Sequence, residues 1–410
     1  MTAPVGRAPD LATAASPDQR SYRLTEIDLL RGLVIVIMAL DHVRDFFLAG
    51  ALQDPTTDPN VTAGLFLTRW ITHFCAPVFV FLAGTSAGLM AARKSRTELA
   101  RFLFTRGLWL IAVEWFVIST AATFAPGGIA DIGGQTLVTM QVIWAIGASM
   151  IALSAAQTLG KRACLLLGAL IVSGHNLLDP IWPQTALFDQ RWPLWTALHS
   201  QMSLSIGPFL LVFLYPLLPW LGVMLIGFGL SGVFELPFTQ RNAALLKAGL
   251  AMTAAFVALR VIGFYGDPNP WQFQAGGITS TGIDFLNTTK YPPSLDFLLM
   301  TLGPSAILCA NADRIPTGVA RVLTTLGRVP FAFYVAHVFL IHSLSVLLGV
   351  IQGFSASQFM TIFLFYPSGY GVPLPGVYVV WVLVITILYP FCRWMASLKA
   401  RRRDWWLSYV

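Results

Sequence analysis

The chain has 410 residues, of which 56% are hydrophobic and 11% are charged, and its formal net charge is +7. Soluble globular proteins carry roughly 25% charged residues, so this composition excludes an ordinary water-soluble domain and indicates that lipid is the main solvent. The positive charge gives no reason to expect a nucleic-acid partner, because most Lys and Arg residues flank apolar segments, where they face anionic lipid.

The beginning of the chain, residues 1–24, is rich in Ala, Pro and Arg and has no apolar core. We expect a disordered cytoplasmic tail there and no cleavable signal peptide. A transmembrane domain follows over 25–398, and the end of the chain, 399–410, is predicted to be a basic cytoplasmic tail.

Long apolar segments recur throughout this domain. A helix needs about 20 apolar residues to cross a hydrocarbon core of about 30 Å, and it satisfies its own backbone polar groups while doing so. We therefore predict an all-α, polytopic membrane bundle of about ten (10–11) transmembrane helices, near 27–49, 72–92, 102–125, 137–159, 163–178, 218–235, 243–265, 295–310, 329–351 and 376–396. The segment 204–219 is apolar but contains three prolines, so we expect a re-entrant or broken segment there.

The positions of the basic residues predict the orientation of these helices. Short cytoplasmic loops hold an excess of Lys and Arg. If both termini are cytoplasmic, the basic residues that fall on the opposite side are only Arg44, Arg69, Arg191, Arg260 and Lys290. We therefore expect a multi-pass protein with both termini in the cytoplasm.

The first predicted helix carries the sharpest polar pattern. Ten residues separate Arg31 from His42, which places them within about 20° of one helical face and roughly 16 Å apart along the axis. Arginine suits phosphate and histidine suits proton transfer near neutral pH. Asp41 and Asp45 flank the histidine and are candidates to orient it. An alternative for Arg31 is a membrane anchor paired with Asp28.

Other ionisable side chains fall inside the predicted spans, where each Arg, Lys or Asp costs at least ~2.5 kcal/mol at the centre. Arg69 and His73 share one face, and Arg106 and Glu114 nearly do. Glu114 either orients a histidine, binds the acceptor, or is a buried partner of Gln141 or an arginine. The remaining candidates at mid-membrane or outer depth are His175, Asn176, Arg260, His337 and His342. Each histidine alone favours a structural role, but their joint depth favours a polar cavity that opens outward.

Two further patterns favour packing. The run 77–88 is rich in small residues that permit close helix contacts. The four cysteines, Cys75, Cys164, Cys309 and Cys392, lie in or beside apolar spans without metal-ligand spacing, so we interpret them as packing residues and predict no metal cofactor.

Several segments resemble a known family. Residues 23–32 (RLTEIDLLRG) and 74–84 (FCAPVFVFLAG) are similar to the opening of bacterial heparan-α-glucosaminide N-acetyltransferase-like membrane proteins, and weaker matches occur at 215–220, 290–295 and 327–331. The spacing of Arg31 and His42 resembles the arginine, ten residues, histidine motif of the wider transmembrane acyltransferase superfamily. The resemblance implies that cytoplasmic acyl-CoA is threaded into a bundle in the bacterial inner membrane and that its acyl group passes to a sugar or glycan on the other side.

One departure from this family affects the catalytic residue. The animal lysosomal enzymes have a catalytic histidine in the luminal loop after the first helix, whereas residues 50–71 here contain none. His42, or alternatively His73, would take that role. We therefore expect Arg31, with Arg106 or Arg328, to hold the phosphates of acyl-CoA, with acetyl-CoA as the family donor.

His42 would then act as general base, oriented by Asp41 or Asp45, and an acyl-His intermediate is the alternative mechanism. His73, Glu114 and His337 are candidates for the acceptor side. Substrate contacts are expected from Arg69, Gln141, His175, Asn176, Arg260, His337 and His342.

Two other functions compete with acyl transfer. A proton-coupled transporter or flippase would also use intramembrane histidines and carboxylates as a relay, but the sequence has no clear internal pseudo-symmetry of the kind many transporters have. A non-catalytic membrane scaffold would leave these histidines unexplained. The lipid bilayer is an expected partner in every case. The sequence neither requires nor excludes a homo-oligomer.

Overall fold

The computed structural model describes residues 25–50, 61–183, 185, 187, 190–402 and 404–408. The predicted tail over 1–24 lies outside the described residues. At the other end of the chain, the last helix continues to Arg401, beyond the predicted start of the basic tail at 399.

Most of the described chain is helical. The helices are α1 (Thr25–Phe47), α2 (Ala63–Thr72), α3 (Cys75–Met90), α4 (Arg96–Val113), α5 (Ser119–Thr123), α6 (Val142–Ala156), α7 (Lys161–Gly174), α8 (Leu217–Gly229), α9 (Phe238–Ile262), α10 (Ile278–Leu286), α11 (Leu295–Ala310), α12 (Thr317–Gly327), α13 (Pro330–Ile351) and α14 (Leu374–Arg401). A π-helical turn, Glu114–Ile118, joins α4 to α5. Every predicted span overlaps one of these helices.

Fewer helices meet the requirements of a membrane span than the sequence predicts. Seven helical segments of the described residues are long and apolar enough, and some of them join consecutive helices such as α2 and α3. They are Ala63–Met90, Arg96–Thr123, Val142–Leu159, Leu217–Glu235, Phe238–Ile262, Pro330–Ile351 and Leu374–Arg401. Helices α7 and α11 are short, with 14 and 16 residues, and α1 carries several charged side chains. The chain is thus a multi-pass membrane protein, while ten spans and cytoplasmic termini stay predictions.

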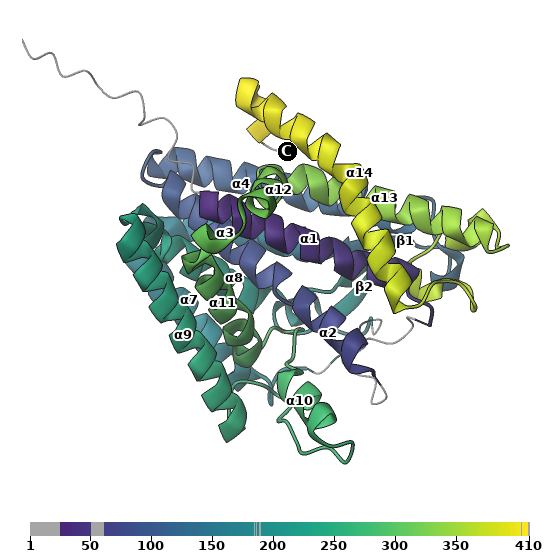
Figure 1. Cartoon of the computed structure of the whole chain (residues 1–410), viewed down its shortest axis with the longest axis horizontal. Helices are drawn as coiled ribbons and strands as arrows, with labels where there is room; N and C mark the ends of the chain where they lie inside the picture. The colour runs from purple at the N-terminus through teal and green to yellow at the C-terminus, as the bar shows by residue number, and fades with distance from the viewer. Residues whose placement is uncertain are drawn as a thin grey trace, which may run out of the picture.

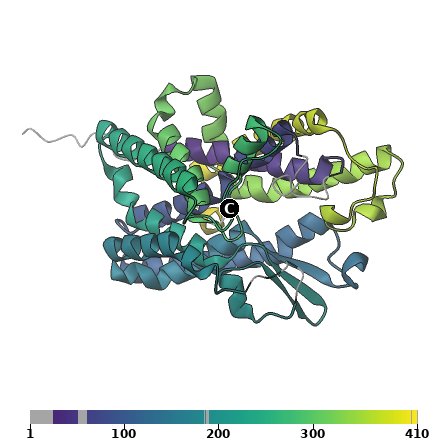
Figure 2. The same cartoon turned by 90° about the horizontal axis from the view of Figure 1, so that it is seen from below.

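The prediction of an all-α chain is wrong at one edge of the bundle, where three strands form a small sheet (Figure 2). The strands are β1 (Thr136–Met140), β2 (Met202–Ile206) and β3 (Phe209–Phe213), in the order β1-β3-β2. β1 runs parallel to β3, with Thr136 opposite Phe209. β2 is antiparallel to β3, with Met202 opposite Phe213.

This sheet replaces the expected re-entrant segment over 204–219 and the start of the expected span over 137–159. Gly207, with φ +56°, and Pro208 form the turn between β2 and β3, and Pro216 precedes α8. Pro208 and Pro216 therefore stand between elements, and Pro219 lies in the first turn of α8, where a helix tolerates proline. The apolar runs before and after the turn at Gly207 and Pro208 are too short for a membrane helix. Their backbone groups are satisfied instead by pairing with other strands.

Helix α1 crosses the middle of the bundle and contacts α3, α12, α13 and α14 (Figure 1). Its closest approach is to α12, because a Cβ added at Gly32 would lie 1.8 Å from the carbonyl oxygen of Leu323. Helices α3 and α8 approach similarly, since a Cβ at Gly84 would lie 2.1 Å from the carbonyl oxygen of Met224. The contact at Gly84 confirms the prediction that the small residues of this run permit close packing.

Candidate active site

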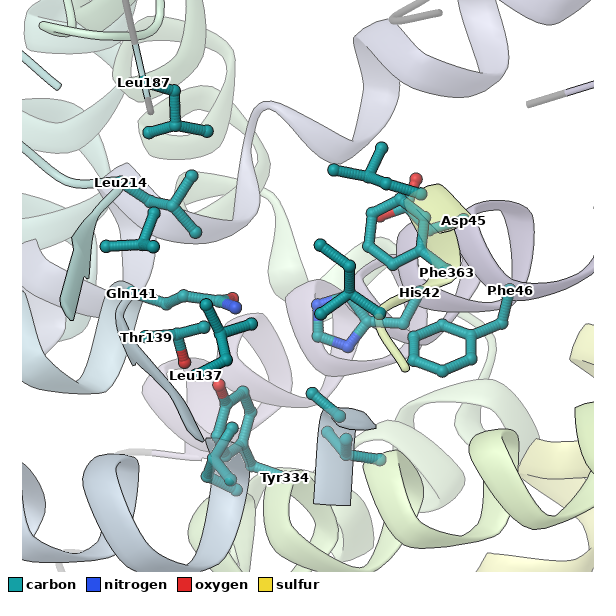
Figure 3. Close-up of a pocket in the computed structure, with 16 residues that line it drawn as sticks. His42, Asp45, Phe46, Leu137, Thr139, Gln141, Leu187, Leu214, Tyr334 and Phe363 are labelled. Carbon is teal, nitrogen blue, oxygen red and sulfur yellow. The ribbon is translucent and has the colours of Figure 1, made fainter. Parts of the chain in front are cut away.

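Two cavities lie in succession along α1. The first, which we call the arginine cavity, has a volume of about 270 Å³ and includes Arg31 and Arg106 in its lining. The second, the histidine cavity, has a volume of about 150 Å³ and is lined in part by His42 and Asp45 (Figure 3). Tyr334 of α13 contributes to the lining of both, so the cavities meet at its side chain.

A single stripe of α1 faces this pair of cavities. Arg31 and Met38 line the arginine cavity, and His42, Asp45 and Phe46 line the histidine cavity. Their separations of three, four and seven residues are those that keep side chains on one face of a helix. Arg31 and His42 thus share a face, as their spacing predicts.

The imidazole of His42 is held by a second histidine. Its Nδ1 lies 2.8 Å from Nε2 of His337, and Nδ1 of His337 lies 2.5 Å from the backbone carbonyl oxygen of Tyr334. A carbonyl only accepts hydrogen bonds, so Nδ1 of His337 carries the proton and its Nε2 accepts one from His42. When both rings are neutral, Nε2 of His42 therefore holds a lone pair.

The two carboxylates beside His42 bind arginines. Asp41 accepts hydrogen bonds from Arg69, at 3.0 and 3.1 Å, and from Thr72 at 2.8 Å, and it lies 3.0 Å from Nη1 of Arg44. Asp45 accepts a hydrogen bond from Arg44. Among the residues that the structure describes, neither carboxylate is hydrogen-bonded to His42, so His337 orients the ring.

The arginine cavity combines two cations with an apolar wall. Nη2 of Arg31 donates to the hydroxyl of Ser86 at 2.5 Å, and Nη1 lies 3.4 Å from Asp28. The guanidinium of Arg106 lies 5.4 Å from the ring centre of Phe331, within the range of a cation–π contact. Arg328 is half exposed, 4.0 Å from Asp28, and does not line this cavity.

The arginine cavity adjoins a wider hollow at the N-terminal end of α1. This hollow has a volume of about 790 Å³ and shares Arg31, Ser86 and Met90 with the cavity. Arg93 also lines it. An anionic ligand in this hollow would lie beside both Arg31 and Arg93.

Glu114 lies behind the histidine cavity and binds the start of α6. Its Oε2 accepts a hydrogen bond from the backbone nitrogen of Trp144 at 3.2 Å, and its Oε1 lies 3.4 Å from the Thr139 hydroxyl. A carboxylate suits this place because the first N–H groups of a helix have no partner within the helix. Glu114 thereby fixes the junction of β1 and α6, where Thr139 and Gln141 line the cavity.

Four of the other predicted site residues support loops or packing. Arg260 donates to the backbone carbonyls of Asn269, Asp284, Phe285 and Asn287. The two ring nitrogens of His342 each lie 2.8 Å from a backbone carbonyl, of Ala121 and of Phe359. Asn176 donates to Asp179 at 2.8 Å, and the buried ring of His73 packs against Phe297.

The ring of His175 packs against that of His199, away from both cavities. Thus the structure brings Arg31, Arg106, His42, Asp45 and Gln141 to the two cavities, with His337 in contact with His42. It leaves Asp41, His73, Glu114 and Arg69 outside the cavity linings, together with His175, Asn176, Arg260, Arg328 and His342. Within the described ranges no group of three or more His, Cys, Asp or Glu side chains could hold a metal ion.

Sequence reasoning missed three polar residues of the cavities, namely Tyr334, Thr139 and Ser86. Tyr334 precedes His337 by three residues on α13. Residues at this spacing lie on the same helical face, so the sequence alone could have indicated that Tyr334 lies near His337. Ser86 lies within a run of small residues that favours packing. Thr139 belongs to β1, a segment that the sequence predicts as helix, so its position beside the cavity could not be inferred from the local sequence pattern.

A comparison with known protein families identifies the family of the chain. Residues 23–265 match the family model of the heparan-alpha-glucosaminide N-acetyltransferase catalytic domain, which is more than half of the chain. No curated protein matches the chain. Because the match covers α1 to α9 and with them the Arg31 to His42 stripe, the chain belongs to the heparan-alpha-glucosaminide N-acetyltransferase catalytic-domain family and is a membrane acetyltransferase-like protein.

Proposed function

We propose that this protein transfers an acyl group, in the simplest case acetyl, from cytoplasmic acyl-CoA to a hydroxyl or amine of a sugar or glycan on the outer side of the membrane. The observation that carries the proposal is the single stripe of α1. It joins a cavity with two arginines to a cavity with a histidine base, and Tyr334 lies where the cavities meet.

The arginine cavity suits the donor. CoA carries several phosphate charges, and the planar fork of an arginine matches phosphate oxygens. Arg31 and Arg106 line the cavity, and Arg93 lines the adjoining hollow. The apolar side chains that line the same cavity, such as Phe79 and Phe102, suit the pantetheine arm. This arm would carry the thioester toward Tyr334.

His42 has the geometry of a general base. Its Nε2 takes the proton from the acceptor hydroxyl or amine while the acceptor atom attacks the thioester carbonyl carbon. The carbon–sulfur bond then breaks, and the imidazolium returns the proton to the departing thiolate, which gives free CoA. The acceptor at Nε2 of His337 stabilises the imidazolium through its hydrogen bond to Nδ1 of His42. Attack by Nε2 itself, with an acyl-His intermediate, uses the same lone pair.

The histidine cavity suits a polar acceptor. Asp45, Thr139 and Gln141 offer hydrogen-bonding groups beside His42. A further hollow of about 170 Å³ shares Asp45 with this cavity and is lined by Tyr366 and Tyr370. Aromatic and hydrogen-bonding side chains together fit a sugar that enters from the end of the bundle opposite Arg31.

A proton relay is less well supported. The hydrogen-bonded pair of His42 and His337 resembles the start of a relay, but Nδ1 of His337 is bound to the carbonyl of Tyr334. A carbonyl oxygen carries no exchangeable proton, so the chain of titratable groups stops there. The pair is therefore better suited to holding one ring than to moving protons onward.

The decisive experiment uses the full-length protein in lipid nanodiscs with radiolabelled acetyl-CoA and a panel of amino sugars and neutral sugars. We expect transfer by the wild type, and none by His42→Ala, which should still bind CoA with unchanged affinity. An active His42→Ala variant would overturn the assignment of the base. A wild type that does not bind CoA would overturn acyl transfer and favour the transporter.

A further inference from the structure

We propose that Tyr334 limits the length of the acyl group that the site accepts, by forming the wall between the arginine cavity and the histidine cavity. The inference rests on the proposed function, because it assigns the arginine cavity to the donor. It concerns a residue outside the matched range 23–265, so the family match gives it no role.

The side chain of Tyr334 is held firmly in this position. It is 5% exposed, and its ring centre lies 6.5 Å from that of His42, edge to face, and 5.5 Å from that of His337. Its backbone carbonyl accepts the hydrogen bond that anchors His337. Movement of this ring would therefore disturb the same histidine pair that presents the base.

The hydroxyl of Tyr334 points into the histidine cavity, toward Thr139 and Leu137 (Figure 3). In the part of the chain that the structure describes, no residue forms a hydrogen bond with it. The ring thus separates the two cavities by its bulk, and no polar partner is needed to explain its position.

The position of the ring has a consequence for the donor. The thioester must reach the end of the arginine cavity next to Tyr334 so that an acceptor activated by His42 can attack its carbonyl carbon. Beyond the ring, the available space is the histidine cavity of about 150 Å³, which the acceptor must occupy. A two-carbon acyl group needs little of that space, whereas a longer chain would displace the ring or compete with the acceptor.

The test measures how strongly acyl-CoAs of increasing length displace radiolabelled CoA from the full-length protein in nanodiscs. The probes are acetyl-, butyryl- and hexanoyl-CoA. For the wild type we expect affinity to fall at least about tenfold from acetyl- to hexanoyl-CoA, the size of effect that extra methylenes have in a closed apolar site. Tyr334→Ala should remove most of this fall by joining the cavities.

Two further variants separate bulk from chemistry and from misfolding. Tyr334→Phe keeps the ring and should keep the wild-type length profile, so a profile like that of Tyr334→Ala would overturn the steric role. Tyr334→Leu keeps the site apolar and should give an intermediate profile if the alanine variant does not fold.

The outcomes also separate this inference from the proposed function. If CoA does not bind the wild type, the proposed function fails and the inference with it. If CoA binds but the length profile is the same in the wild type, Tyr334→Ala and Tyr334→Leu, only the role of Tyr334 is overturned. A parallel measurement of transfer with each donor should follow the same order as the affinities.

Discussion

Nδ1 of His42 lies 2.8 Å from Nε2 of His337, and the two rings meet edge to edge, with their centres 4.9 Å apart and their planes only 14° apart. His337 is in turn bound to the backbone of its own helix at the carbonyl of Tyr334. The backbone of α13 therefore fixes the tautomer and the direction of the His42 ring on α1. We interpret His337 as a positioning residue, since it does not line the histidine cavity.

Replacing His337 should slow acyl transfer without weakening donor binding. In His337→Ala the ring of His42 loses its acceptor, and misplacement of a catalytic group can cost up to about 10²-fold in rate. We expect kcat to fall by about 10- to 100-fold while the affinity for CoA changes little. His337→Gln offers a carbonyl oxygen to the same Nδ1–H and should recover part of the rate.

The matched control for this helix is Ser343→Ala. Ser343 is exposed, and among the described residues its hydroxyl donates only to the carbonyl of Phe339 in the same helix, so its loss should leave kcat unchanged. Equal rates for His337→Ala and Ser343→Ala would show that His337 has no positioning role. A large loss of CoA affinity in His337→Ala would indicate general damage to the bundle instead.

Arg31 should contribute to donor binding and little to the chemical step. A hydrogen bond to a charged group contributes about 1.5–3 kcal/mol, so Arg31→Gln should weaken CoA binding by roughly 10- to 100-fold and raise KM with kcat nearly unchanged. Arg101→Gln removes the same charge from an exposed position on α4 and should have little effect. Equal effects of the two variants would mean that only the overall charge matters.

The same variant can be tested with dephospho-CoA to find which phosphate Arg31 contacts. If Arg31 binds the 3′-phosphate, Arg31→Gln and the wild type should bind dephospho-CoA equally. If it binds the pyrophosphate, the difference between the two proteins should persist. Binding of both ligands with wild-type affinity by Arg31→Gln would contradict any phosphate contact.

The sequence predicts the α1 part of this site well and the rest poorly, for a physical reason. Helical periodicity alone places Arg31 and His42 on one face, because both lie in one continuous helix. The partner of His42 is 295 residues away, and no local pattern links the two histidines. The role of Glu114 likewise depends on the parallel pairing of β1 with β3, which sets where α6 begins and which sequence patterns do not reveal.

The orientation of the bundle can be tested by cysteine labelling, because all four native cysteines are buried. Thr97→Cys lies at the exposed start of α4, on the side of Arg31 in the predicted topology, and Gln274→Cys lies in an exposed loop on the opposite side. We expect a membrane-impermeant maleimide to label Gln274→Cys in intact cells, and Thr97→Cys only after permeabilisation. The reverse pattern would place the arginine cavity away from cytoplasmic CoA and remove the basis of the proposed function.

The charge cluster around Asp41 should stabilise the fold. Asp41 faces Arg69 and Arg44 at 3.0 Å each, and removing one partner of a buried ion pair costs about 3–5 kcal/mol. Asp41→Asn should therefore lower the thermal unfolding midpoint clearly. Asp404→Asn is the control, because the pair of Asp404 with Arg402 is exposed and 3.8 Å long, and exposed pairs contribute little. Similar midpoints for both variants would mean that the cluster is not structural.

The crossing of α1 and α12 should tolerate no side chain at Gly32. A Cβ there would lie 1.8 Å from the carbonyl oxygen of Leu323, so Gly32→Ala must push the two helices apart, and overpacking of this kind costs about 1–3 kcal/mol. Because Arg31 immediately precedes Gly32, the same shift should also weaken CoA binding. The matched control is Gly282→Ala in α10, where a Cβ would meet nothing within 4 Å and alanine favours the helix. We expect a lower unfolding midpoint for Gly32→Ala and an unchanged or higher one for Gly282→Ala, measured in the same nanodiscs. A wild-type midpoint and CoA affinity in Gly32→Ala would show that α12 can move away from α1 without cost.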